Sequence, residues 1–192
     1  MKIFLPLCGK SGDLIHLYNL GHSVLGLEGV HYVAESAFKD NGLDFTKTRV
    51  PEIDGFRLAT PDGRLVIYAC DLFRMTPEVL GPVDTIFDRG SFEAILEVDR
   101  PKYVALMKAV LAPKFRIVLN GYEYDNSKFP GPPRHVDRRV VQELYGMLEK
   151  AFFSKLTVKA IKVLFSQVSL RQWRSWRRVM LGREPKFSVW TR

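Results

Sequence analysis

Apolar residues along the first two thirds of the chain fall into short runs that alternate with helical patterns. Unbroken apolar runs predict buried strands, and apolar residues spaced three and four positions apart predict helices. The runs predict strands over residues 3–7, 23–27, 65–69, 84–88 and 115–119, and the helical spacing predicts helices over residues 14–20, 32–38, 99–112 and 137–148. Strands that alternate with helices favour a doubly wound α/β fold with a mostly parallel sheet.

A hairpin interrupts this alternation. Residues 56–59 and 65–69 are apolar runs on either side of Pro61, Asp62 and Gly63, and Asp-Gly between such runs is a strong signal for a tight turn. We therefore expect the two runs to pair as antiparallel strands. Residues 156–165 and 187–190 predict two further strands near the C-terminus, and one of them would end the sheet as an antiparallel strand.

Residues that cap helices lie where the predicted helices begin and end. Asp13 and Asp137 can accept backbone N–H groups at a helix start, and Asp99 followed by Pro101 opens another helix. Gly21 ends the first helix. The chain has 192 residues, 46% of them hydrophobic, and no internal repeat, so we expect a single domain over residues 1–192.

Charge and composition narrow the classes of partner. Residues 134–192 hold 14 of the 29 basic side chains and 4 of the 21 acidic ones, and we interpret these cations as a solvated face. Two cysteines, Cys8 and Cys70, and no secretory-type leader favour a reduced, cytoplasmic location. No apolar run approaches the roughly 20 residues that span a bilayer. We expect a monomer that binds neither membrane nor nucleic acid.

The candidate chemistry lies at the carboxyl ends of the predicted strands. Gly9, Glu28, Asp71 and Asp88 each follow or end a strand, and ligands of open α/β sheets bind at this edge. From its position, Glu28 can accept hydrogen bonds from both ribose hydroxyls of an adenosine cofactor. Asp71 can accept one from the adenine amino group. Each acid alone would more often be solvated or a helix cap, but four strand ends in phase favour a cofactor site.

The turn after the first strand indicates which class of adenosine cofactor the site can bind. A dinucleotide needs backbone N–H groups packed against its pyrophosphate, and hence a G-x-G-x-x-G pattern, whereas this turn has only Gly9 and Gly12. S-adenosylmethionine carries no phosphate and tolerates such a loop. The turn therefore favours S-adenosylmethionine.

Several motifs together resemble the thiopurine S-methyltransferase family. Residues 5–10 (Leu-Pro-Leu-Cys-Gly-Lys), 21–24 (Gly-His-Ser-Val) and 26–28 (Gly-Leu-Glu) are similar to the first two strands of that family. Asp-Arg-Gly at residues 88–90 resembles its DRG motif, and residues 124–133, from Tyr-Asp to Pro-Gly-Pro-Pro, resemble its YD…PGPP loop. The resemblance covers about residues 1–150 and is more specific than any one motif.

The resemblance implies a class I, Rossmann-like methyltransferase with helices on both faces of its sheet. It implies methyl transfer from S-adenosylmethionine to the sulfur of an aromatic or heterocyclic thiol, or in some members to a small selenium species. The residues assigned to the cofactor are Leu7, Glu28 and Leu72 from the resemblance and Gly9, Asp71 and Asp88 from their strand ends. Arg89 is the implied catalytic and substrate-side residue, and Arg171 is our choice for a second substrate-side arginine.

Catalysis by such an enzyme is mostly positioning. The sulfonium is already activated, so displacement needs the acceptor sulfur, the methyl carbon and the leaving sulfur in line. Arg89 beside the acceptor would favour the thiolate over the thiol without acting as a base. We predict no metal site, because the four histidines show no ligand spacing with the cysteines.

The chain departs from the family pattern in three places. Residues 29–31 (Gly-Val-His) stand where a Ser and an acid are usual, and residues 134–135 (Arg-His) stand where an aromatic is usual. The family also has a segment before its first strand that covers the cofactor, whereas this chain begins at that strand. We therefore expect a folded protein with weak cofactor affinity and low methyl transfer.

Two other classes of protein stay open. One is an N-terminally truncated methyltransferase fold with weak or no activity, and the other is a basic binding module on the same scaffold. Residues 171–178 interleave arginines with Trp173 and Trp176, as single-strand nucleic-acid platforms do, although Trp residues at this spacing more often form an apolar helix face. We interpret Cys8 as a packing residue, and Arg89 has a purely structural salt bridge as its alternative role.

Overall fold

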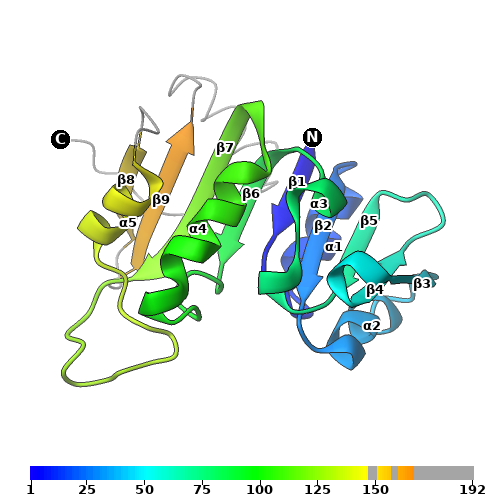
Figure 1. Cartoon of the computed structure of the whole chain (residues 1–192), viewed down its shortest axis with the longest axis horizontal. Coiled ribbons are helices and arrows are strands. Elements are labelled where there is room, and N and C mark those ends of the chain that lie inside the picture. The colour runs from blue at the N-terminus through cyan, green and yellow to red at the C-terminus, as the bar shows by residue number, and fades with distance from the viewer. Residues whose placement is uncertain (147–150, 157–159, 167–192) are drawn as a thin grey trace.

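The computed structural model describes residues 1–146, 151–156 and 160–166, which form one sheet with helices on both faces (Figure 1). The strands are β1 (Lys2–Leu5), β2 (Ser23–Glu28), β3 (Thr46–Val50), β4 (Gly55–Ala59), β5 (Leu65–Ala69), β6 (Val83–Arg89), β7 (Leu111–Tyr122), β8 (Ala151–Leu156) and β9 (Ala160–Ser166). The helices are α1 (Gly12–Asn19), α2 (His31–Lys39), α3 (Pro77–Leu80), α4 (Arg100–Ala109) and α5 (Arg138–Tyr145). Short 3-10 helices cover Pro51–Ile53, Leu72–Arg74 and Glu97–Asp99.

The strand order is β3-β4-β5-β2-β1-β6-β7-β9-β8. The five central strands, from β5 to β7, run parallel, and antiparallel strands continue the sheet at both edges. The predicted α/β fold class is therefore confirmed. The predicted hairpin is confirmed as well, because β4 pairs with β5 in antiparallel register. A single domain over residues 1–192 stays a prediction.

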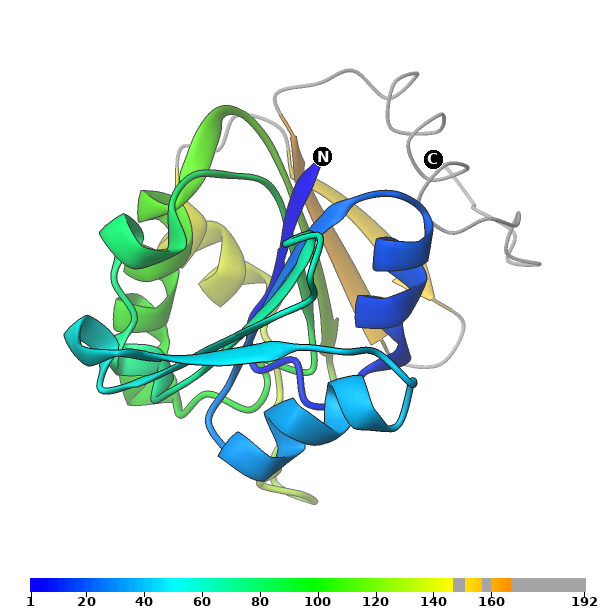
Figure 2. The same ribbon diagram turned by 90° about the vertical axis from the view of Figure 1, so that its right-hand side faces the viewer.

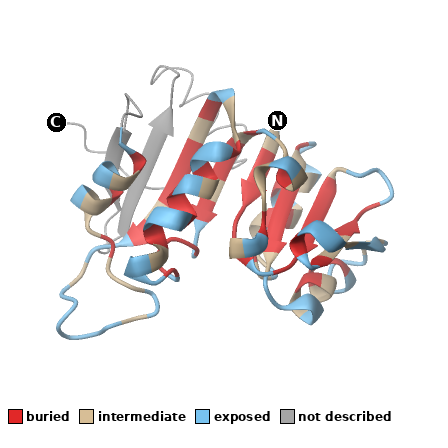
Figure 3. Cartoon of the chain, viewed as in Figure 1, coloured by how far each residue is buried: buried red, intermediate tan, exposed pale blue. Residues whose placement is uncertain are grey.

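Two apolar clusters cover the two faces of the sheet. Figure 2 shows α1 and α2 on one face and α3, α4 and α5 on the other. The alternation of β1 explains the division, since Ile3 and Leu5 belong to the α1 and α2 cluster while Phe4 belongs to the α4 cluster. All three side chains are at most 3% exposed, and burying each contributes about 1.5–3 kcal/mol. Figure 3 shows this buried layer along the central strands.

Some local predictions need correction. Ser11, not Asp13, caps α1, because the Ser11 side chain accepts the backbone N–H of Asp13. The predicted strand over residues 156–165 agrees with β9 over residues 160–165, whereas β8, the antiparallel partner of β9, was not predicted except for its last residue, Leu156. The exposed edge strand β3 was not predicted, because its sequence Thr-Lys-Thr-Arg-Val carries no apolar run. The predicted strand at residues 187–190 lies outside the described residues.

Candidate active site at the carboxyl edge of the sheet

The carboxyl ends of β1, β2, β5 and β6 lie next to one another at one edge of the sheet (Figure 1). Leu5 at the end of β1 pairs with Gly26, and Glu28 at the end of β2 pairs with Ala69 at the end of β5. The segments that follow these strands therefore share one edge. They carry Leu7, Gly9, Glu28, Asp71, Leu72, Asp88 and Arg89, the predicted site residues that lie within the described part of the chain.

The turn after β1 is held in an unusual backbone conformation. Leu7 has a φ of 42° and Gly9 a φ of 54°, both in the left-handed region. This conformation costs a residue with a Cβ roughly 1–2 kcal/mol, so Leu7 is strained where Gly9 is not. The Cys8 N–H donates to the Leu27 carbonyl oxygen at 2.8 Å, which ties the turn to β2. Strain of this kind clusters at ligand sites.

Glu28 is fixed by backbone groups from two loops. Its Oε2 accepts the Gly9 N–H at 3.0 Å, and its Oε1 accepts the Val30 N–H at 2.9 Å. A carboxylate oxygen has about two acceptor positions, so each oxygen keeps one for a ligand. The half-buried Glu28 therefore presents two oriented acceptors, the arrangement that two neighbouring ribose hydroxyls require.

Asp71 has a local structural role. Its Oδ1 accepts the Phe73 N–H at 2.8 Å and so caps the 3-10 helix Leu72–Arg74. The side chain is exposed, and Oδ2 has no hydrogen-bond partner among the described residues. Leu72 is only 4% exposed and packs in the apolar cluster on the α4 face. Asp71 thus has one oxygen available to a ligand, whereas little of Leu72 reaches the surface.

Asp88 points into the core. Its Oδ1 accepts the Phe92 N–H at 3.0 Å, and its Oδ2 accepts the Tyr103 hydroxyl at 2.7 Å. Burial raises the pKa of Asp88 to about 6, although these hydrogen bonds oppose the rise. The carboxyl holds the turn after β6 against α4. Because both carboxylate oxygens are bonded inside the core, only the backbone of Asp88 can contact a cofactor.

Arg89 points outward from the same turn. Its side chain is 59% exposed, and Nη1 donates to Oδ2 of Asp13 in the first turn of α1. An exposed ion pair of this kind contributes about 0–1 kcal/mol. The pair matches the structural alternative for Arg89, and its weakness leaves the guanidinium available to an anionic ligand.

Two buried charged residues near the turn after β6 were missed by sequence reasoning. Glu93 is 4% exposed and Arg100 is 3% exposed, and within the described part of the chain neither Oε2 of Glu93 nor Nε of Arg100 has a hydrogen-bond partner. Burial raises the pKa of Glu93 to about 7, and the charge of Asp88 adds to the rise. The sequence did hold one sign that Glu93 is buried, because Glu93 lies in the mostly apolar stretch Ser-Phe-Glu-Ala-Ile.

The loop between β7 and α5, residues 123–137, contains the Pro-Gly-Pro-Pro motif and extends beyond the carboxyl end of β7 (Figure 1). We call it the β7–α5 loop. The Tyr124 N–H donates to Nδ1 of His135 at 3.0 Å, and the two rings meet edge to face with centroids 5.7 Å apart. Phe129 is 47% exposed, and the centroid of its ring lies 6.1 Å from the centroid of the Tyr124 ring. Because His135 also bridges Tyr122, the last residue of β7, the loop carries this aromatic group close to the end of β7.

The cysteines are poor candidates for chemistry. Cys8 and Cys70 are unpaired and buried. Burial raises the pKa of Cys8 far above its ordinary value and that of Cys70 to about 11, so both stay protonated thiols near neutral pH.

In the described ranges, no three His, Cys, Asp or Glu side chains are grouped so that they could hold a metal ion. The predicted Arg171 lies outside those ranges, as do Trp173 and Trp176.

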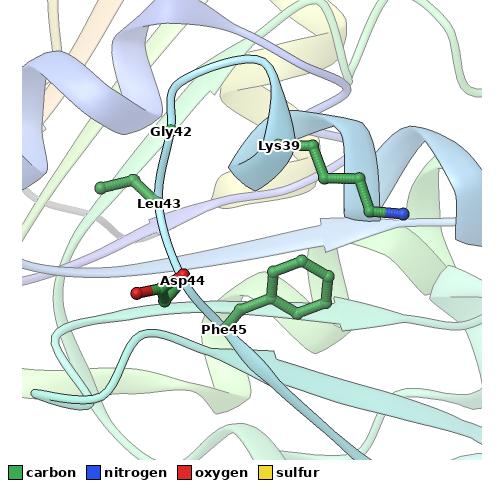
Figure 4. Close-up of a pocket in the computed structure, with 5 residues that line it drawn as sticks. All are labelled: Lys39, Gly42, Leu43, Asp44 and Phe45. Carbon is green, nitrogen blue, oxygen red and sulfur yellow. The ribbon is translucent and has the colours of Figure 1, made fainter.

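Figure 4 shows a surface hollow next to the end of α2. It is lined by Lys39 at the end of α2 and by Gly42, Leu43, Asp44 and Phe45 from the loop that leads to β3. The lining comes from a single stretch of chain and includes none of the predicted site residues. We therefore do not assign the cofactor to this hollow.

Comparisons with known proteins agree with this geometry. A sequence model of the thiopurine S-methyltransferase family matches residues 1–175. A probable thiopurine S-methyltransferase of Danio rerio is 32% identical over 147 residues, which cover 76% of this chain and 63% of the relative. The thiopurine S-methyltransferase of Bos taurus is also 32% identical over 147 residues, covering 76% of this chain and 60% of the relative. The chain thus spans about three fifths of the length of these relatives.

Solved structures share the fold at low sequence identity. The 1,6-didemethyltoxoflavin-N1-methyltransferase of Burkholderia thailandensis, solved with S-adenosylhomocysteine, has a TM-score of 0.57 and 15% identity, covering 88% of this chain and 71% of that one. A glycopeptide N-methyltransferase has a TM-score of 0.59 and 13% identity, covering 85% and 82%. The predicted methyltransferase fold is therefore confirmed. The family match extends past the motifs to residue 175, and the chain belongs to the thiopurine S-methyltransferase family.

Proposed function

We propose that this chain binds S-adenosylmethionine at the ends of β1, β2 and β5 and transfers its methyl group to the sulfur of an aromatic or heterocyclic thiol. Membership of the family supports the reaction class. The name carried by the relatives from Danio rerio and Bos taurus supports the thiol acceptor.

The observation that carries the proposal is the fixed carboxylate of Glu28. Its oxygens are held at 3.0 Å from the Gly9 N–H and 2.9 Å from the Val30 N–H, so they are oriented before any ligand arrives. Preorganised acceptors lose little entropy on binding. A Cβ placed on Gly9 would meet no atom within 4 Å, so the space beside the Gly9 backbone is open. These residues fit the adenosine part of the cofactor.

The remaining residues divide into two halves along the edge. On the adenosine half, Oδ2 of Asp71 can accept from the adenine amino group, and the strained turn at Leu7 brings its backbone to the strand end. On the acceptor half, Arg89 stabilises a thiolate and holds it in position, and the thiol proton passes to solvent. The bound cofactor supplies a methyl group already activated by its sulfonium. Arg171 as a second acceptor-side cation stays a prediction.

We also propose that the protein acts on its small-molecule acceptor as a monomer in the cytoplasm. Two unpaired, buried cysteines support a reducing compartment. Among the helices that the structure describes, none is both long and apolar enough to cross a membrane.

The test is the affinity for S-adenosylhomocysteine of the wild-type chain, Glu28→Gln and Glu28→Ala, measured by calorimetry. Glu28→Gln keeps the size of the side chain but replaces one acceptor by an NH2 group. We expect its affinity to fall about 10- to 150-fold, because a hydrogen bond to a charged group contributes about 1.5–3 kcal/mol. Glu28→Ala should lose more, since it also releases the N–H groups of Gly9 and Val30.

The matched control is Glu143→Gln, which changes an exposed glutamate of α5 on the other half of the molecule and should bind like wild type. A thermal-shift comparison with NAD and ATP completes the test, because a ligand at 100 times its dissociation constant adds about 2.7 kcal/mol of stability. Wild-type affinity in both Glu28 variants, or stabilisation by NAD alone, would exclude the proposed site.

A further inference from the structure

The β7–α5 loop is joined to residues 93–100 by two arginines. Nη2 of Arg100 donates to the His135 carbonyl oxygen at 3.0 Å. From the loop side, the Arg134 N–H donates to the Glu93 carbonyl oxygen at 2.8 Å, and Nη1 of Arg134 donates to the Ala94 carbonyl oxygen at 2.6 Å. These hydrogen bonds connect a long, mostly exposed loop to the packed segment between β6 and α4.

Arg100 occupies an unfavourable place for a cation. It is the first residue of α4, where the helix dipole repels positive charge, and it is 3% exposed. Burial lowers its pKa, and the nearby charge of Arg134 lowers it further, with Glu97 and Glu93 acting in the opposite direction. A buried guanidinium so placed adds little net stability in general. A contribution to stability therefore does not explain why an arginine stands at this position.

The surroundings of Arg100 restrict where its donors point. Its guanidinium carbon lies 4.8 Å from the centroid of the Phe92 ring, a stacking contact that fixes the plane of the group. The bonded residue, His135, is the one that accepts the Tyr124 N–H and forms a bridge with Tyr122. Holding the His135 carbonyl oxygen therefore also holds the aromatic group that contains Tyr124 and Phe129.

The loop lies on the acceptor half of the edge. Glu28 and Asp71, the carboxylates fitted to adenosine, belong to the ends of β2 and β5. The β7–α5 loop instead follows β7, which pairs with β6 up to Arg89 and Asn120. A loop in this place borders the space that the acceptor thiol would enter.

We propose that Arg100 is a positioning residue for the acceptor: by holding the His135 carbonyl oxygen it fixes the β7–α5 loop, and with it Tyr124 and Phe129, against the acceptor half of the edge. This inference rests on the proposed methyl transfer. It assigns Arg100 no contact with the reacting atoms, because Arg100 acts through the loop.

The test compares Arg100→Met and Arg100→Lys with wild type in two measurements. The first is amide hydrogen exchange of residues 122–136, which reports the loop without any substrate. The second is KM and kcat for an aromatic thiol, together with affinity for S-adenosylhomocysteine. We expect Arg100→Met to exchange loop amides about tenfold faster and to raise KM about tenfold, with cofactor affinity within about twofold of wild type. Arg100→Lys keeps a donor and should recover part of both effects.

Arg134→Met provides an independent test if Arg100→Met does not fold. It removes only the side-chain bond to the Ala94 carbonyl oxygen and keeps the backbone bond to Glu93, so it should change exchange and KM in the same direction but less. The control is Arg139→Ala, an exposed arginine whose ion pair partner, Asp137, is the last residue of the loop and lies outside the measured residues 122–136. It should leave loop exchange and KM unchanged.

The outcomes separate this inference from the proposed function. Unchanged loop exchange in folded Arg100→Met and Arg134→Met would overturn the positioning role, whether or not the wild type methylates thiols. Faster exchange with unchanged KM would also overturn it, because the loop would then not border the acceptor. A wild-type chain that binds no S-adenosylhomocysteine would instead overturn the proposed function, and loop exchange alone would then decide whether Arg100 holds the loop.

Discussion

Glu93 should make the stability of this protein depend on pH. Burial raises the pKa of its carboxyl from an ordinary 4.5 to about 7, with the charge of Asp88 adding to the rise and Arg100 opposing it. The side chain is 4% exposed, and its Oε2 has no hydrogen-bond partner among the described residues. The folded protein therefore binds the Glu93 proton more tightly than the unfolded chain does.

The sign and size of the effect follow from this difference. A raised pKa contributes stability that is fully present below the unfolded value, near pH 4.5, and is lost as the pH rises through about 7. At about 1.4 kcal/mol for each pKa unit, the full loss is about 3 kcal/mol. Glu93→Gln replaces the carboxyl by a neutral group of the same size and removes this dependence.

The assay is urea denaturation of wild type and Glu93→Gln at pH 5, 6, 7 and 8. We expect the stability of the variant relative to wild type to increase by about 2–3 kcal/mol across this range. Asp88, with a pKa of about 6, titrates in the same window in both proteins and largely cancels in the difference. Glu97→Gln, at an exposed position four residues further on, should follow wild type at every pH. A constant difference between Glu93→Gln and wild type would refute the reasoning.

Two further predictions concern the site and its support. Arg89→Met should lower methyl transfer to an aromatic thiol more than it lowers affinity for S-adenosylhomocysteine, with the melting temperature nearly unchanged because the exposed pair with Asp13 contributes at most about 1 kcal/mol. Equal loss of both properties would make Arg89 structural. Gly26→Ala should destabilise the fold by about 1–3 kcal/mol in urea denaturation, since its Cβ would lie 2.7 Å from the Cys8 sulfur, whereas a Cβ at Gly12 meets nothing within 4 Å and Gly12→Ala should be neutral.

The fold could be predicted where burial leaves a periodic signal. The central strands are buried on both faces, so residues such as Phe4, Leu25 and Ile67 form apolar runs that need no knowledge of their neighbours. The edge strand β3 gave no such signal, because it is held by backbone pairing with β4 and exposes most of its side chains. The strand β8, which pairs with β9 in antiparallel register, was missed except for its last residue, because its sequence Ala-Phe-Phe-Ser-Lys-Leu offers only a short apolar run broken by Ser154 and Lys155.

The candidate site could be predicted only as far as strand topology determines it. Glu28 ends a parallel strand, and that placement alone brings it to the ligand edge. The apolar stretch around Glu93 was the signal for its burial, but the burial of Arg100 could not be foreseen, because Arg100 bonds a loop that returns 35 residues later along the chain. Local patterns predict which face a residue takes, but not which distant segment covers it.

The two adjacent residues Asp88 and Arg89 at the end of β6 have different roles, because topology and packing direct their side chains to opposite sides. Successive strand residues point to opposite faces, so Asp88 and Arg89 cannot both face the ligand edge in the same way. Ile86, two residues before Asp88, lies in the apolar cluster on the α4 face, and the Tyr103 hydroxyl from α4 meets the Asp88 carboxyl at 2.7 Å. The inward acid therefore fixes the turn against α4. Because the turn is fixed, the outward guanidinium of Arg89 has a defined place at the end of β6, where we propose that the acceptor binds, and it is tied there by a weak surface ion pair that an anionic ligand can replace.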